Sequence, residues 1–478
     1  MERHYSTPVT LGALVLVVLS AACVCGGAAA SWKENGIPVC TSKGDQLSVE
    51  AVSDGAGGAV IAWYNGGVFA QRLDASGTAL WSADGVNVSL APGSQMPDLV
   101  EDGAGGAIVA WSDLRGGGNP DIYAQRLDSE GRPMWPAGGV PVCTTACAER
   151  CRDVTGDGAG GVIVTWCDDR RSGDCDVYAQ RLDSSGRTLW TMNGVPVCTA
   201  SRSQGYPRVV SDGAGGAIVT WADFRQGTDY WIFAQHLGAA GNALWQENGV
   251  PVCTAAGSKL PRIVPDGAGG GIIVWRDPRR SSDYDIYAQR VSGAGEMLWR
   301  RDGIAVCTAA GAKWWPIAVS DGAGGAIVLW RDYRDGSSYD TYAQRIDPSG
   351  RALWKKNGAL VCAGDYNERY HEMIPDGAGG AIVSWYEERL SGTYDIHAQR
   401  ISPLGKPLWK TAGVVVCAAP EDQQFPVAAP DSKGGAILAW IDLRNGVDQD
   451  VYAQAVGPDG AVGSGARAPK KSRPGLFR

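Results

Sequence analysis

Apolar residues gather in short runs along the chain, and each run is closed by glycine or by polar residues. Within residues 207–253 the runs are PRVVSD (207–212), GAIVTWADFR (216–225), WIFAQHLG (231–238) and ALWQENGVPVC (243–253). They are rich in Val, Ile and Trp and have no helical period, so each run predicts a β-strand. Because several runs are apolar at successive positions, both faces of the predicted sheets must be covered.

The same four-run pattern recurs along the chain at a nearly constant interval. Each copy contains the turn DGAGG, degraded to DSKGG in the last copy, and the turn begins at Asp54, Asp102, Asp157, Asp212, Asp266, Asp321, Asp376 and Asp431. A Trp stands nine residues after each Asp, an Ala-Gln pair follows, and a second Trp precedes a segment similar to NGVPVC. Eight units of four short strands predict an all-β, eight-bladed β-propeller.

The two ends of the repeat complement each other. The last unit stops after Ala453-Gln454, and residues 32–40 (WKENGIPVC) supply the segment that it lacks. We therefore expect the N-terminal strand to complete the last blade and close the ring, which removes exposed sheet edges. The predicted domain is a single propeller over residues 31–460, followed by a disordered tail over 461–478 that is rich in Gly, Ala, Pro and Lys.

Residues 1–30 have the features of an export signal. Arg3 and His4 precede an apolar run from Leu11 to Leu19, and Ala28–Ala30 offer a cleavage site. The pattern predicts an extracellular, cell-surface or periplasmic protein. Two alternatives stay open, a lipoprotein modified at Cys23 and an uncleaved N-terminal anchor.

Composition narrows the classes of partner. The chain has 478 residues, of which 44% are hydrophobic, and a net charge of −8. Nucleic acids and anionic membrane surfaces require a concentrated cationic face, so we expect neither as a partner. We expect no cofactor, because no phosphate-binding loop or dinucleotide fingerprint is present. We also expect no metal, because each DGAGG copy offers one carboxylate and calcium needs six or more oxygen ligands.

The repeated motifs are interpreted as scaffold. Glycines in DGAGG permit the positive φ angles of a tight hairpin. The turn resembles the Asp-box of sialidase-type propellers, but its spacing differs and that family's catalytic residues cannot be carried over. Trp-x-Asp-x-Arg and Asp-x-Tyr-Ala-Gln-Arg recur in most units, which indicates ion pairs that fix blade geometry. The repeated Trp residues are expected to pack between blades.

Cysteines follow two patterns. Seven stand at equivalent positions in separate blades, from Cys40 to Cys417, and are expected to be buried thiols. Four others, Cys147, Cys151, Cys167 and Cys175, fall in the variable loops of the third unit. In an exported protein they predict two disulfides, with Cys167–Cys175 favoured because these residues flank one hairpin loop. A four-cysteine zinc site is the alternative.

The motifs DGAGGAIVxW, DIYAQR and W-x-x-NGVPVC together resemble those of uncharacterised repeat proteins exported by bacteria. The resemblance covers about residues 32–460. It implies a propeller and a location outside the cytoplasm, but no settled activity.

Candidate ligand-binding residues lie in the segments that vary between units. These segments are expected on one face of the ring, where propellers place function. Aromatic and polar side chains suited to a glycan or protein ligand are Trp231, Trp314, Trp315, Tyr366, Tyr370 and His371. The alternative is that these aromatics only brace their own loops.

The function predicted from the sequence is therefore an exported binding or scaffold module that contacts a glycan or protein with its variable-loop face. One alternative is a carbohydrate-active enzyme, a glycosidase or a lyase-like protein, with acids drawn from Glu368, Glu372, Glu387 and Glu388. The other is a purely structural surface protein. No residue is assigned a catalytic role.

Overall fold

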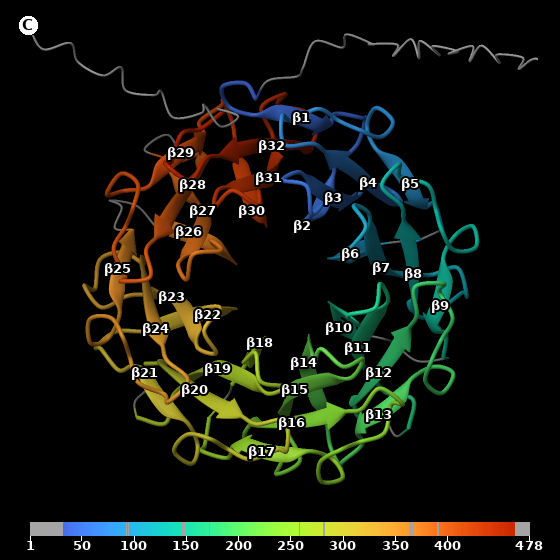
Figure 1. Cartoon of the computed structure of the whole chain (residues 1–478), viewed down its shortest axis with the longest axis vertical. Coiled ribbons are helices and arrows are strands. Elements are labelled where there is room, and N and C mark those ends of the chain that lie inside the picture. Colours follow the sequence, from blue (N-terminus) through green and yellow to red (C-terminus); the bar gives the residue numbers. More distant parts are fainter. Residues whose placement is uncertain are drawn as a thin grey trace, which may run out of the picture.

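The computed structural model describes residues 32–463, except 92, 94, 146–149, 172, 258, 281–282, 363–367 and 390–391. Eight four-stranded antiparallel sheets stand in a ring around a central axis (Figure 1). The predicted eight-bladed β-propeller is confirmed. In the part of the chain that is described, no helix combines the length and apolar character needed to cross a bilayer.

The innermost strand of each blade borders the central channel (Figure 1). These strands are β2 (Leu47–Ser53), β6 (Gln95–Glu101), β10 (Arg150–Gly156), β14 (Gln204–Ser211), β18 (Arg262–Pro265), β22 (Lys313–Ser320), β26 (Glu368–Pro375) and β30 (Gln423–Pro430). The second strands are β3 (Ala59–Tyr64), β7 (Ala107–Asp113), β11 (Val162–Asp168), β15 (Ala217–Asp223), β19 (Gly271–Asp277), β23 (Ala326–Asp332), β27 (Ala381–Glu388) and β31 (Ala436–Asp442).

The two outer strands of each blade complete the ring. The third strands are β4 (Val68–Leu73), β8 (Asp121–Leu127), β12 (Asp176–Leu182), β16 (Trp231–Leu237), β20 (Asp285–Val291), β24 (Asp340–Ile346), β28 (Tyr394–Ile401) and β32 (Asp450–Val456). The outermost strands are β5 (Val86–Ser89), β9 (Val140–Cys143), β13 (Val195–Cys198), β17 (Val250–Cys253), β21 (Ile304–Cys307), β25 (Ala359–Cys362), β29 (Val414–Cys417) and β1 (Ile37–Cys40).

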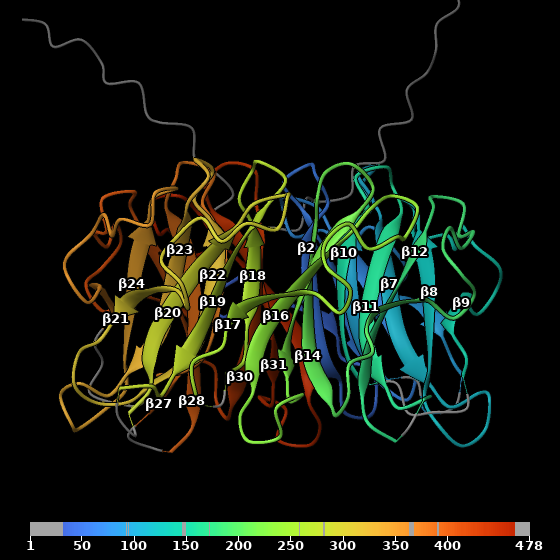
Figure 2. The same ribbon diagram turned by 90° about the horizontal axis from the view of Figure 1, so that it is seen from below.

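Strand direction divides the loops between two faces. Each DGAGG turn joins an innermost strand to a second strand, and the inner strands cross the thickness of the ring (Figure 2). The loops that enter the inner strands and those that leave the second strands therefore lie on the opposite face. We call this the variable-loop face.

The ring is closed by the first strand of the chain. β1 pairs antiparallel with β32, with Ile37 opposite Ala453. The sheet containing β30, β31 and β32 is completed by β1, as the sequence predicts. Side-chain contacts extend the closure, since Arg444 donates to the carbonyl of Asn35 at 2.7 Å.

The core lies between neighbouring blades. The Trp of each second strand is fully buried, with an exposed fraction of 0% for Trp63, Trp111, Trp166, Trp221, Trp275, Trp330, Trp385 and Trp440. The NGVPVC glycine makes room for this ring. In blade five, Gly303 has a φ of +86°, and a Cβ on it would lie 2.5 Å from the Trp275 ring. The repeated Trp residues are thus packing residues.

The Trp-x-Asp-x-Arg motif links adjacent blades. In blade five, Trp275 Nε1 donates to Asp277 Oδ2 at 2.8 Å, and Arg279 lies 2.5 Å from the same oxygen. The Arg279 guanidinium stacks on Tyr287 at 4.0 Å and donates to Cys253 Sγ of the preceding blade at 3.1 Å. We call this set of contacts the latch, and it is the ion-pair scaffold that the motif predicts.

The DGAGG carboxylate is also structural. Asp266 Oδ1 accepts the backbone N–H groups of Ala268 and Gly270, each at 2.8 Å. Its Oδ2 accepts a hydrogen bond from Arg290 Nε at 2.9 Å, and Arg290 in turn donates to the carbonyl of Pro348 in the next blade at 3.0 Å. The turn is therefore a hairpin cap tied to the neighbouring blade.

The fourth strand of the fourth unit is shorter than the sequence predicts. It covers only Val250–Cys253 instead of residues 243–253, and Ala243 makes a single isolated bridge with Leu237. The preceding segment turns so that Trp245 Nε1 can donate to the carbonyl of Gly293 in the next blade at 2.9 Å. This cross-blade bond replaces the ladder that the apolar run suggested.

Candidate functional site

One position on the inner strands forms a ring around the channel. It lies four residues before each DGAGG aspartate and holds Glu50, Asp98, Asp153, Arg208, Arg262, Ile317, Glu372 and Val427. All of these except Val427 line a cavity of about 860 Å³. Other lining residues lie near the ends of second strands, as Arg276 and Arg331 do, or in loops that follow these strands, as Tyr339 does just before β24. The cavity therefore lies at the variable-loop end of the channel.

A β-bulge carries a large side chain at the entrance of most inner strands. The register of β22 against β23 shifts between Trp314 and Ile317, and equivalent shifts occur in six other blades. The bulge residue, six before the DGAGG aspartate, has a φ near +50° in Ser48, Met96, Tyr206, Trp315, Tyr370 and Phe425. Such a φ is strained for bulky residues, and strain of this kind gathers at functional sites. β18 is shorter and has no register shift.

The bulges project apolar side chains into solvent. Trp315 is 60% exposed, Tyr370 49% and Tyr206 46%. Trp315 and Tyr370 line the cavity, and Tyr370 makes an edge-to-face contact with Phe425 at 5.2 Å. The sequence placed Trp315 and Tyr370 in loops, but they lie within β22 and β26, because the bulge lets a strand residue point outward.

The acids of blades two and three are neutralised by arginines. Arg152 Nε lies 2.8 Å from Asp98 Oδ2, and Arg208 lies 3.3 Å from Asp153 Oδ1. The backbone N–H of Val209 also donates to Asp153 at 2.8 Å. This side of the cavity therefore holds paired charges.

Blades five and six contribute arginines of a different kind. Among the described residues, no carboxylate lies within ion-pairing distance of the guanidinium groups of Arg262, Arg276 and Arg331. Burial lowers the pKa of all three, that of Arg262 to about 10. Arg276 stacks on Tyr284 at 4.7 Å and on Trp314 at 4.6 Å. The cavity thus has a cationic wall that is supported by aromatic rings.

Two carboxyl groups of the ring favour their protonated forms. Burial raises the pKa of Glu372 to about 7, although Arg262 opposes the shift. Burial also raises the pKa of Glu50 well above its usual value, with further contributions from Asp98 and Glu372. Near neutral pH these acids therefore carry less negative charge than their number suggests.

Blade seven has lost the latch. Glu387 stands where most blades have the latch Asp, His397 replaces the Tyr, and Glu368 replaces a buried Gln or Lys. His397 Nε2 lies 3.7 Å from Glu387, and His371 Nε2 lies 3.7 Å from the fully buried Glu368. Thr341 of blade six also donates a hydrogen bond to Glu368.

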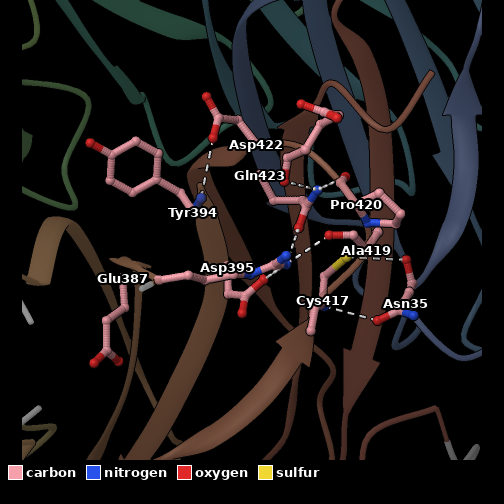
Figure 3. A network of polar contacts seen from close by, with 12 residues as sticks. Asn35, Glu387, Tyr394, Asp395, Cys417, Ala419, Pro420, Asp422 and Gln423 are labelled. Carbon is pink, nitrogen blue, oxygen red and sulfur yellow. Dashed lines mark hydrogen bonds and ion pairs between the residues drawn. The ribbon is translucent and has the colours of Figure 1, made fainter. Parts of the chain in front are cut away.

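Arg389, the corresponding arginine of blade seven, makes contacts that differ from those of the latch arginines. Arg389 pairs with Asp395 and donates to the carbonyl of Ala419 at 2.7 Å, and in Figure 3 Glu387 points away from this network. Of the proposed glycosidase acids, Glu388 pairs with Arg369 at 3.6 Å. Only Glu372 among the four acids lines the cavity.

The structure separates the predicted ligand residues into three groups. Trp315, Tyr370 and His371 line the cavity together. Trp314 supports Arg276, and Trp231 stacks on Phe233 at 6.4 Å, so neither lines it. Tyr366 lies outside the described residues. The sequence analysis did not select Arg262, Arg276 and Arg331 as site residues. Arg262 could have been recognised, because a charged residue in an otherwise apolar inner strand marks a position that faces the channel.

The cysteines of the repeat lie in the protein interior. The repeat thiols Cys40, Cys198, Cys253, Cys307, Cys362 and Cys417 are buried and free, as predicted. Cys167 is buried on β11, and Cys175 is half-buried just before β12. Their pairing stays a prediction, because Cys147 and the side chain of Cys151 lie outside the described part. Within that part, no group of three or more His, Cys, Asp or Glu residues is arranged to hold a metal ion.

Comparisons with known proteins give distant similarities. No family model and no curated protein matches the chain. A polysaccharide lyase described as an ulvan lyase bound to -[GlcA(1-4)Rha3S]- aligns at a TM-score of 0.46 and 11% identity, over 90% of this chain and 96% of that one. An α-L-arabinanase of Penicillium chrysogenum aligns at 0.34 and 11%, over 64% and 92% of the two chains. A Hadza microbial sialidase aligns at 0.36 and 12%, over 70% and 73%. These scores assign neither a family nor an activity to this chain.

Proposed function

We propose that this chain is a binding module and that its ligand is a glycan held at the variable-loop end of the central channel. The observation that supports this most is that Trp315 and Tyr370, which are 60% and 49% exposed, both line the cavity. Aromatic faces stack on the apolar faces of sugar rings, and charged groups nearby bond hydroxyls. The volume of about 860 Å³ is suited to a few sugar units.

We also propose that the protein is exported. The proposal depends on the leader-like residues 1–30, with their apolar run from Leu11 to Leu19. Detection of the protein in cell fractions, with the N-terminus of the mature form sequenced, tests it. A mature chain that starts at Ser31 supports cleavage, whereas lipidation at Cys23 supports the lipoprotein alternative.

The binding proposal is tested on a glycan array with the purified protein. The variant Trp315→Ala with Tyr370→Ala is expected to lose selective binding. Tyr206→Ala is the matched control, because Tyr206 has the same bulge conformation but does not line the cavity. A blank array with folded wild-type protein would reject the glycan and redirect the search to protein ligands. Self-association without any ligand would favour the structural alternative.

A second candidate function, catalysis on the bound glycan, is favoured by Glu372. A carboxyl group with a pKa of about 7 inside a ligand cavity has the acidity of a general acid or base. Product release from polysaccharides, measured by reducing ends and by ultraviolet absorbance of unsaturated sugars, tests this function. Activity that survives Glu372→Gln would remove Glu372 from that role, and Glu388→Gln serves as the control outside the cavity.

A further inference from the structure

Three arginines that line the cavity differ from the arginines of the repeat. Those of the repeat are neutralised, as Arg290 is by Asp266 and Arg279 by Asp277. Arg262, Arg276 and Arg331 have no such carboxylate among the described residues, and all three line the cavity. A partly buried cation without a counter-ion is unfavourable. Three of them in adjacent blades indicate that the missing anions come from a ligand.

Aromatic rings hold two of these side chains in place. Arg276 lies against Tyr284 and Trp314, whose rings are 5.1 Å apart, and Arg331 lies 4.5 Å from Tyr339. Stacking leaves the N–H groups at the guanidinium edges available. Among the described residues, the guanidinium groups of Arg276 and Arg331 donate no hydrogen bond, whereas the latch guanidinium of Arg279 donates to Cys253, Asp277 and Asp302. Donors without acceptors are what a site for a planar or tetrahedral oxyanion requires.

The acids in the cavity wall do not cancel this charge. Asp98 and Asp153 are paired with Arg152 and Arg208. Burial favours the protonated forms of Glu372 and Glu50. The excess positive charge therefore lies on blades five and six, beside Trp315 of blade six.

We propose that Arg262, Arg276 and Arg331 bind the carboxylate or sulfate groups of an acidic polysaccharide while Trp315 and Tyr370 stack on its sugar rings. This rests on the proposed function and specifies the class of glycan. Guanidinium groups form two parallel hydrogen bonds with a carboxylate or sulfate, which an ammonium group cannot do. Because the whole chain has a net charge of −8, the attraction for an anionic polymer arises at the cavity arginines and not from the protein surface as a whole.

The test uses pairs of polymers that share a backbone and differ in charge. Polygalacturonate is compared with its fully methyl-esterified form, and dextran sulfate with dextran, by isothermal titration or affinity electrophoresis of the full protein. We expect the protein to bind at least one of the charged polymers and not to bind the neutral polymer of the same pair. Added NaCl is expected to weaken this binding. The polymer that binds distinguishes carboxylate from sulfate recognition.

Variants connect the binding to the named residues. Arg276→Gln and Arg331→Gln are each expected to lower the affinity for the charged polymer by roughly tenfold or more, because each removes a charge-assisted hydrogen bond. Arg331→Lys is expected to recover only part of it, since the fork is missing. Arg132→Gln, which changes a mostly exposed arginine outside the cavity, is expected to bind like the wild type. Circular dichroism and thermal melting confirm that each variant is folded.

The possible outcomes distinguish failure of this inference from failure of the function on which it rests. Equal binding of charged and neutral partners, or unchanged binding by the arginine variants, overturns the inference and leaves the glycan proposal standing. Binding of the wild-type protein to neutral glycans alone on the array also overturns the inference and leaves the glycan proposal standing. Failure to bind any of the four polymers and any glycan on the array overturns both the inference and the glycan proposal. Tighter binding of a DNA duplex than of any polysaccharide overturns the inference.

Discussion

The indole N–H of Trp275 donates to Asp277 at 2.8 Å, and the oxygen that accepts it is also paired with Arg279. The fully buried Lys259 lies 3.9 Å from the same oxygen. One carboxylate therefore lies beside two cations and also accepts a hydrogen bond from a buried indole. The repeated latch is thus a network in which removing the acid leaves several groups without partners.

Asp277→Asn is expected to lower the free energy of unfolding by about 3–5 kcal/mol, because it leaves Arg279 and Lys259 without a counter-ion. Asp128→Asn is the control, since its pair with the exposed Arg132 is screened by solvent and contributes little to stability. Denaturant unfolding monitored by Trp fluorescence measures both. Similar losses in the two variants would contradict the latch as described.

Ionisation of Asp277 makes the stability of the folded protein depend on pH. Burial alone would raise the pKa of Asp277, but hydrogen bonds from Arg279 and Trp275 hold it below its usual value. The pair therefore stabilises the folded state above the unfolded pKa of about 4, and this contribution is lost as the pH falls through the folded pKa. The difference in melting temperature between the wild type and Asp277→Asn is expected to shrink on acidification below pH 4.

Backbone strain at the bulges predicts an unusual order of stabilities. At Tyr206, with a φ of 53°, glycine is expected to be more stable than alanine by about 1 kcal/mol, since only glycine adopts this φ without penalty. At Val415, an exposed residue of β29 outside the positive-φ set, the ordinary order with alanine above glycine is expected. Melting temperatures of the four variants measure the two differences. The same order at both sites would argue against strain.

Glu372 predicts a second pH dependence with the opposite sign. Its pKa is raised from an ordinary value near 4.5 to about 7, so the folded protein binds a proton that the unfolded chain has released. This stabilisation is present below pH 4.5 and is lost as the pH rises through 7. Glu372→Gln keeps a neutral side chain, so its melting temperature relative to the wild type is expected to increase between pH 4.5 and 7 and then level off. Glu247→Gln, an exposed control, should give no such trend.

The repeat thiols predict a pattern of chemical reactivity. Burial raises the pKa of Cys198 to about 12 and that of Cys253, Cys307 and Cys417 to about 11, so little thiolate forms at pH 8. Maleimide labelling followed by peptide mass spectrometry is expected to leave these four unmodified in the native protein and to modify them in denaturant. Ser337→Cys supplies an exposed thiol as a positive control. Rapid native labelling of Cys198 would show that the blade interface opens.

The propeller was predictable because its signal repeats. A fixed interval between DGAGG turns, two Trp positions per unit and the complementary ends together determine eight blades and their closure. The short outer strand was not predictable in this way. The run around Trp245 is apolar enough for a strand, but the partner of its indole N–H lies in the next blade, at Gly293.

The site was only partly predictable for a related reason. Trp315 and Tyr370 stand out as additional aromatics at variable positions, and both line the cavity. Arg276 and Arg331 directly follow the second-strand Trp, at a position where the other units have Tyr, Ser, Cys, Ala or Ile, but this position alone does not assign them a role. What distinguishes them is the absence of a neighbouring carboxylate in the described structure, and that depends on contacts between strands and blades that a single sequence does not reveal.

The pairing of β1 with β32 also constrains the order in which the molecule can be completed. A chain synthesised from its N-terminus makes β1 first and its ladder partner β32 last, more than 400 residues later. Seven blades can form from contiguous segments, but the eighth needs both ends of the repeat at once. Until β32 has been made, β1 has no strand to pair with, and the blade at each end of the growing arc has one face without a neighbouring blade. Final ring closure is therefore the step at which an incomplete or damaged chain would be distinguished from an intact one.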